Sequence, residues 1–231
     1  MEWRNYYMDV MLVPLGLVMM VAYHVWLWHK TQTQPFSTTF GRDAHGRRLW
    51  VPAMIKDIDK KNIVAVQSLR NLIMGSSLMA TTAILICAGL GAVISSTYSV
   101  KKPINDTIFG AHGKFMVGLK YAILLAMFSF SFLCHTFSIG FLNQVSVLIC
   151  TPQHVKSMVT SEYLTELLDK TILLNLVGNR LFYSALCLLL WIFGPVLAFF
   201  SSMAMVIILY NLDFLGGNST NDVDNFIPDD V

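Results

Sequence analysis

Charged side chains are scarce in this sequence. Asp, Glu, Lys and Arg make up 13% of its 231 residues, whereas hydrophobic residues make up 55%. Soluble domains carry about 25% charged residues, so this deficit excludes an ordinary soluble domain and predicts an integral membrane protein. The length leaves room for one membrane domain, expected over residues 1–215, and for short loops, but not for a second soluble domain.

Recognisable catalytic and metal-binding motifs are also missing. The sequence has no Walker loop, no H-E-x-x-H, no C-x-x-C and no Ser/His/Asp order. Its cysteines, Cys87, Cys134, Cys150 and Cys187, lie within or at the edge of apolar segments, where they act as small hydrophobic residues. We therefore expect no enzymatic activity, no cofactor and no bound metal. Nucleic acid is not an expected partner, because the basic residues lie between apolar segments and form no known reading module.

Long uncharged runs dominate what is present. Each is long enough to cross a bilayer core, which needs roughly 20 helical residues. They predict an all-α membrane protein with four transmembrane helices, at about residues 8–29, 71–97, 116–149 and 180–212. A secretory signal peptide is the alternative for the first run, but the leading Met-Glu-Trp-Arg is not a basic n-region and no cleavage site follows. We therefore expect a retained span.

A glycine and a proline, Gly194 and Pro195, interrupt the last run. A proline inside a helix removes a backbone hydrogen bond and kinks the helix. Two shorter crossings split at this point are the alternative. The sequence disfavours them, because the first crossing would carry Asn179 and Arg180 into lipid. We therefore expect one kinked span.

The run at 71–97 is rich in small residues. Gly75, Ser77, Thr81 and Gly91 belong to this set, and Ser77 and Thr81 lie four residues apart on one helical face. Small residues let helix backbones approach closely in lipid, which predicts the central packing helix of a bundle and a homo-oligomer. The functional interpretation is a pore or cleft lined by Ser77 and Thr81. The alternative is that small residues are simply common in transmembrane helices.

Two polar segments connect the runs and predict amphipathic cytoplasmic helices. In the first, Pro52 can begin a helix whose apolar residues alternate with Lys56, Lys60 and Lys61. Such a helix either lies on anionic lipid headgroups or packs on its own domain. The second segment begins at Thr151 and Pro152 and continues to about residue 179 as a surface helix.

The placement of basic residues predicts the orientation. Most Lys and Arg residues lie in loops 30–70 and 150–180. Because basic loops stay cytoplasmic, both termini of a four-span protein should face the outside or the lumen of the plasma membrane or an endomembrane. The two glycosylation sequons, at Asn105 and Asn218, fall on that side. The tail 216–231 is acidic and lacks basic residues, so we expect it to be disordered.

Four ionisable side chains are candidates for function. His24 and His135 lie within apolar runs, where each either hydrogen-bonds to a neighbouring helix or relays a proton or an ion. Arg70 and Arg180 lie at the expected cytoplasmic ends of spans. Each either snorkels to the interface or forms part of a basic vestibule that attracts anions or lipid phosphates.

Several short motifs together resemble a known family. They are the Tyr23, His24, Trp26 end of the first run, the Gly41, Arg48, Trp50 segment, the Gln67, Leu69, Arg70, Asn71 sequence and the Trp191, Phe193, Gly194, Pro195 sequence. The chain resembles a plant member of the domain of unknown function 599 family. The resemblance implies a small multi-span membrane protein and no established chemistry. The residues then leave two interpretations open, which are an oligomeric channel or transporter for a small solute or ion and a non-catalytic membrane scaffold or interaction protein.

Overall fold

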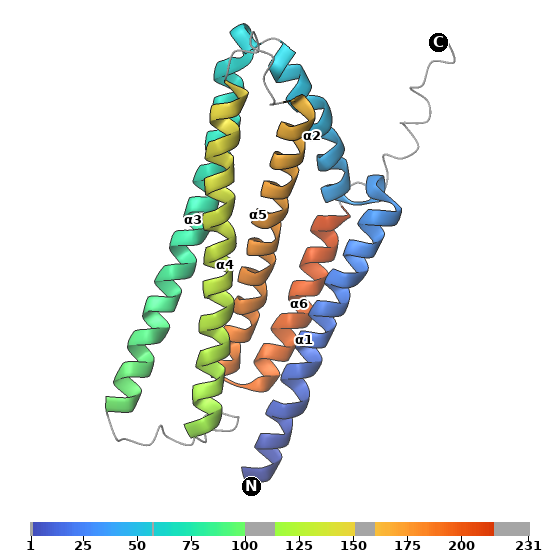
Figure 1. The fold of residues 1–231 in the computed structure, drawn as a ribbon. Coiled ribbons are helices and arrows are strands. Elements are labelled where there is room, and N and C mark those ends of the chain that lie inside the picture. Colours follow the sequence, from blue (N-terminus) through green and yellow to red (C-terminus); the bar gives the residue numbers. More distant parts are fainter. Residues whose placement is uncertain (1, 57, 100–113, 151–159, 215–231) are drawn as a thin grey trace.

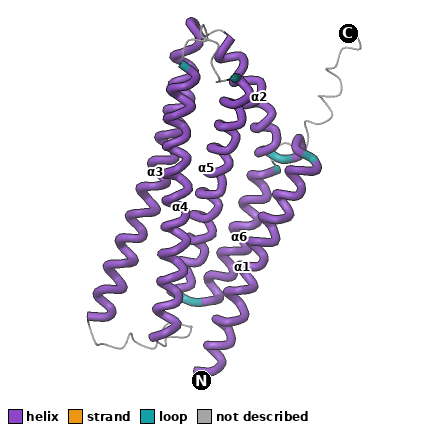
Figure 2. The backbone as a smooth tube through the Cα atoms, in the orientation of Figure 1, coloured by secondary structure: helices purple, strands orange, loops and turns teal. Residues whose placement is uncertain are grey.

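The computed structural model describes residues 2–56, 58–99, 114–150 and 160–214. All regular structure in these residues is helical (Figure 2). The elements are α1 (Glu2–Thr33), η1 (Pro35–Ser37), α2 (Thr39–Lys56), α3 (Ile58–Ser99), α4 (Lys114–Ile149), α5 (Ser161–Leu189), η2 (Leu190–Ile192) and α6 (Pro195–Asp213). The predicted tail 216–231 and both sequons lie outside the described residues.

Five helices in the described part are long and apolar enough to cross a membrane, one more than the sequence predicted. They are α1, α3, α4, α5 and α6. The difference arises at the predicted span 180–212, which is divided between two helices. The surface helix predicted after Thr151 is not a separate element in the described residues. It forms the first part of α5, which runs without interruption from Ser161 to Leu189.

Pro195 begins a helix here and does not kink one. A short 3-10 turn follows α5, and Pro195 occupies the first turn of α6, where its missing N–H costs no helical hydrogen bond. The chain reverses direction at this turn. The Ser201 hydroxyl of α6 then donates to the carbonyl of Cys187 in α5 at 3.3 Å, so the two helices lie side by side. Figure 1 shows α5 and α6 as this antiparallel pair.

The helices pack as two groups. α4 lies between α3 and α5, whereas α1 packs mainly on α6 (Figure 1). The beginning of α1 and the end of α6 lie at opposite ends of the bundle, so the expectation that both termini share one side does not fit this arrangement. Within a single chain, the central helix is α4, and α3 lies at one edge.

The face of α3 that packs on α4 agrees only in part with the small residues that the sequence singled out. It carries Ser76, Ala80, Ala83, Cys87 and Leu90, which are all buried and recur at helical spacing.

The predicted packing residues of α3 lie on its other faces. A Cβ added at Gly75 or Gly91 would have no neighbour within 4 Å. The Thr81 side chain is exposed, and Ser77 is half-buried. These residues therefore do not form the helix contacts of the single chain, and their packing against a second copy stays a prediction.

Helix α2 packs on its own domain, which was one of the two alternatives for this segment. Val51 is buried in an apolar cluster with Leu142 of α4 and Leu164 of α5. The Arg47 Nε donates to Asp169 Oδ1 of α5 at 2.7 Å. The helix begins at Thr39, well before the predicted start at Pro52, and it covers one end of the bundle.

Gly41 allows the close approach of α2 to the preceding turn. A Cβ at this position would overlap the backbone carbonyl of Pro35, and backbone atoms cannot swing aside as a flexible side chain can. Gly46 lies in the same helix, and a Cβ there would have nothing within 4 Å.

We expect Gly41→Ala to destabilise the protein by about 1–3 kcal/mol, because the added methyl overpacks a backbone contact. Gly46→Ala is the matched control, and it should be neutral or stabilising by up to about 1 kcal/mol, since alanine favours helix more than glycine does. Thermal unfolding of the purified variants measures both effects. Equal melting temperatures for the two variants would contradict the close contact at Gly41.

Candidate binding crevice between α1 and α5

A crevice of about 490 Å³ lies between α1 and α5, towards the end that α2 covers. It exists because α1 packs on α6 and α5 packs on α4, with few direct contacts between α1 and α5. Most of its lining is apolar. The polar exceptions are His24, Thr31, Thr38, Arg180, Ser184 and Asp213. Apolar pockets with a few polar groups are typical small-molecule sites.

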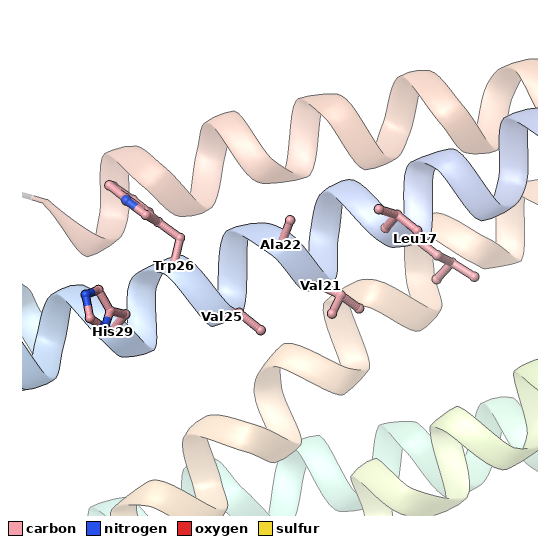
Figure 3. Close-up of a pocket in the computed structure, with 7 residues that line it drawn as sticks. Leu17, Val21, Ala22, Val25, Trp26 and His29 are labelled. Carbon is pink, nitrogen blue, oxygen red and sulfur yellow. The ribbon is translucent and has the colours of Figure 1, made fainter.

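A second groove of about 550 Å³ follows the surface of α1 (Figure 3). Leu17, Val21, Val25 and His29 line it, while Trp26 points towards α6. Trp26 stacks there on Tyr210, with 6.2 Å between ring centroids. This groove is open and nearly all apolar, which is what a lipid-facing helix surface requires. We therefore place the candidate site in the crevice and not in this groove.

A buried polar cluster joins three helices at the crevice. The Arg180 Nη2 of α5 forms an ion pair with Asp213 Oδ1 of α6. The Tyr23 hydroxyl of α1 donates to Asp213 Oδ2 at 2.6 Å. The Thr39 hydroxyl of α2 lies 3.1 Å from the carbonyl of Asp213, which brings a fourth helix to the same point. Both carboxylate oxygens of Asp213 are therefore occupied, and its charge is compensated.

Arg180 has a partner inside the bundle that the sequence analysis did not anticipate. Its side chain is 15% exposed, and it lies within α5, where Asp213 supplies the opposite charge. The sequence analysis missed Asp213 because this residue directly follows the last uncharged run and was assigned to the loop beyond it. The last uncharged run begins directly after Arg180 and ends directly before Asp213. Opposite charges at the two ends of one run are the signal that could have identified the pair.

His24 also lines the crevice. Its Nδ1 lies 2.6 Å from the carbonyl of Met20, and because a carbonyl only accepts, Nδ1 carries the proton. Its Nε2 has no hydrogen-bond partner among the described residues, and the same is true of the Arg180 Nη1. Both atoms are shielded from solvent. Buried polar atoms without partners are rare, and they are often explained by an additional group that binds there.

His135 lies inside the bundle but outside the crevice. It is fully buried between α4 and α5, where Gly178 makes room for it, since a Cβ on Gly178 would lie 2.9 Å from the His135 Nε2. One turn away on either side, the Ser131 and Ser138 hydroxyls donate to the carbonyls of Gly178 and Thr171. His135 is therefore packed between two helices beside these hydrogen bonds, and neither of its own ring nitrogens has a hydrogen-bond partner among the described residues.

The remaining predicted site residues do not join the crevice. Arg70 is exposed on α3. The Thr81 hydroxyl donates to the carbonyl of Ser77 at 2.8 Å, within the same helix. Gly194 and Pro195 lie at the turn between α5 and α6, at the opposite end of the bundle. The structure therefore brings together only two of the predicted residues, His24 and Arg180.

A second buried polar cluster, which the sequence analysis missed, lies near that turn. The Trp191 Nε1 donates to Asp9 Oδ1 at 2.5 Å, and the Lys120 Nζ lies 3.4 Å from the same oxygen. The ammonium also donates to the carbonyl of Trp191 at 3.4 Å. Asp9 and Lys120 each directly precede an uncharged run and fall at the edges of the predicted spans 8–29 and 116–149, where no sequence pattern pairs them. Helix α1 is therefore fixed by polar contacts at two points, Asp9 and Tyr23.

Comparison with known proteins identifies a family. The family model described as "Protein of unknown function, DUF599" matches residues 11–217. No curated protein and no solved structure matches the chain. The matched range includes all the crevice-lining residues, among them both members of the Arg180 and Asp213 pair.

We expect Asp213→Asn to destabilise the protein by about 3–5 kcal/mol, because it leaves the Arg180 charge without its partner in a nearly buried position. Asp43→Asn, at an exposed position of α2, is the control and should change the stability by less than about 0.5 kcal/mol. Thermal unfolding in detergent measures both. The double substitution Arg180→Met with Asp213→Leu should restore much of the loss, since it removes both charges. No recovery in the double variant would contradict the charge argument.

Proposed function

This chain belongs to the DUF599 family, and we propose that it transports a small, mostly apolar molecule that binds in the crevice between α1 and α5. The observation that carries the proposal is the crevice itself, an apolar space that is lined by few polar groups. Its apolar helices make the protein an integral multi-pass membrane protein. The proposal assigns it binding and movement of a solute and no catalysis.

The packing supports movement across the membrane. The crevice separates α1 from α5, while α6 packs on both of these helices. The two groups are joined at one end by the turn at Leu190–Ile192 and at the other by η1 and α2. Rocking of one helix group against another around a central site is a common mechanism of membrane transporters. The buried clusters of Asp9 and of Asp213 lie where such a motion would open and close the two ends.

The distribution of basic residues supports one orientation. The α2 end of the bundle carries Arg42, Arg47, Arg48 and Lys56, and this end is cytoplasmic in the proposal. The Arg48 side chain is 71% exposed, so it can contact anionic lipid headgroups. The end of α6 then faces the cytoplasm and the start of α1 faces the opposite side.

The orientation can be measured with reporters. A glycosylation reporter fused before α1 should be modified, and the same reporter fused after α6 should not be modified, because five crossings place the two ends on opposite sides. Modification at both ends would favour the four-span arrangement and contradict five crossings.

The transport proposal can be tested by filling the crevice. Val177 lines it and is 42% exposed, whereas Val196 of α6 does not line it and is also 42% exposed. Proteoliposomes would be assayed for uptake of radiolabelled octyl glycosides, octyl sulfate and tetraethylammonium at tracer concentration. We expect uptake of at least one solute that Val177→Trp lowers about tenfold and Val196→Trp leaves unchanged.

Uptake that is absent for every solute, or that is equal in the two variants, would contradict transport through the crevice. Recovery of a specific protein partner after mild detergent extraction, with no uptake, would favour the scaffold.

A further inference from the structure

We propose that the ligand of the crevice is an uncharged amphipathic molecule whose polar end carries a hydroxyl group. The inference rests on the proposed function and adds the chemical class of the solute. It is argued from the charge balance at the crevice and from the two polar atoms there that lack partners.

The charges at the crevice compensate each other. Arg180 and Asp213 form a one-to-one pair, and Tyr23 donates to the remaining carboxylate oxygen. An anionic ligand would be attracted by Arg180 but repelled at short range by Asp213. A cationic ligand would be attracted by Asp213 but repelled by Arg180. In an apolar environment such uncompensated charge is costly. The site therefore disfavours both kinds of ion.

The two unpartnered atoms are of opposite kind. The Arg180 Nη1 can only donate, because a guanidinium has no acceptor. The His24 Nε2 can only accept in the neutral ring, because the proton is on Nδ1, which donates to Met20. Both residues line the crevice.

A hydroxyl group matches this pair. It can accept a hydrogen bond from Arg180 and donate one to His24. A carboxylate could only accept, and would face the lone pair of the His24 Nε2. An ammonium could only donate, and would face Arg180. The nearby Ser184 hydroxyl already donates to the carbonyl of Arg180 at 2.8 Å, so it offers no competing donor.

The remaining wall matches an apolar body. The crevice is otherwise lined by apolar side chains, among them Leu17 and Val21 of α1 and Leu173 and Leu176 of α5. A molecule that enters from the bilayer would place its chain along these residues and its hydroxyl at His24 and Arg180.

The inference can be tested with three probes that share one chain and differ in the head group. Radiolabelled decanol, decanoate and decylammonium would be bound at pH 8 to the full-length protein in lipid nanodiscs, with empty nanodiscs as the background. We expect saturable binding of decanol, with an affinity at least tenfold higher than that of either ion. Val177→Trp should abolish this binding, and Val196→Trp should leave it unchanged.

A substitution at His24 tests the acceptor. We expect His24→Leu to lower the affinity for decanol about tenfold, the size expected when one buried hydrogen bond is lost, with a smaller effect on decanoate. The ratio of the two affinities is the readout, because a general loss of structure would lower both.

The outcomes separate this inference from the proposed function. Preferred binding of decanoate or decylammonium that Val177→Trp abolishes would overturn the hydroxyl class and leave the crevice as the binding site. Binding of all three probes that is equal in Val177→Trp and Val196→Trp would overturn both the class and the site. The probe comparison on the unmodified protein decides the class even if His24→Leu fails to fold.

Discussion

The ion pair between Arg180 and Asp213 is the interaction on which the topology depends. An arginine in a membrane-spanning helix is costly unless it has a partner, and this pair supplies one from a helix that lies antiparallel to it. It allows α5 to continue past Arg180 to Leu189 and α6 to return along it. The same contact places the end of α6 beside Thr39 and therefore at the α2 end of the bundle.

The sequence predicted a membrane helix correctly where a long uncharged run allows few other structures. The predicted span 116–149 agrees closely with α4, because a long run without charge has few alternatives to a membrane helix. The last span was wrong for a different reason. The prediction treated Arg180 as an isolated charge that would be costly to place in lipid. The residue that compensates this charge, Asp213, lies 33 residues further along the chain. Such a partner depends on the hairpin that it stabilises, so no local pattern reveals it.

The packing face of α3 and the polar clusters show two further limits of sequence reasoning. Small residues indicate that a close helix contact is possible, but Gly75 and Gly91 lie away from α4 while Ala80 and Ala83 contact it. His24 was identified because an ionisable residue inside an apolar run is conspicuous. Asp9, Lys120 and Asp213 were not identified, because each borders an uncharged run, where a charged residue is expected and does not stand out.

The apolar crevice can stay open because the protein is surrounded by lipid and not by water. In water, burial of apolar surface contributes about 25 cal/mol per Å², which would favour closing α1 onto α5. In a bilayer this driving force is absent, because lipid chains contact the crevice wall as favourably as a second helix does. The helices are then held where directional polar contacts fix them. On α1 those contacts are made by Asp9 and by Tyr23, and the apolar side chains of the crevice are left to contact lipid or a ligand from the membrane.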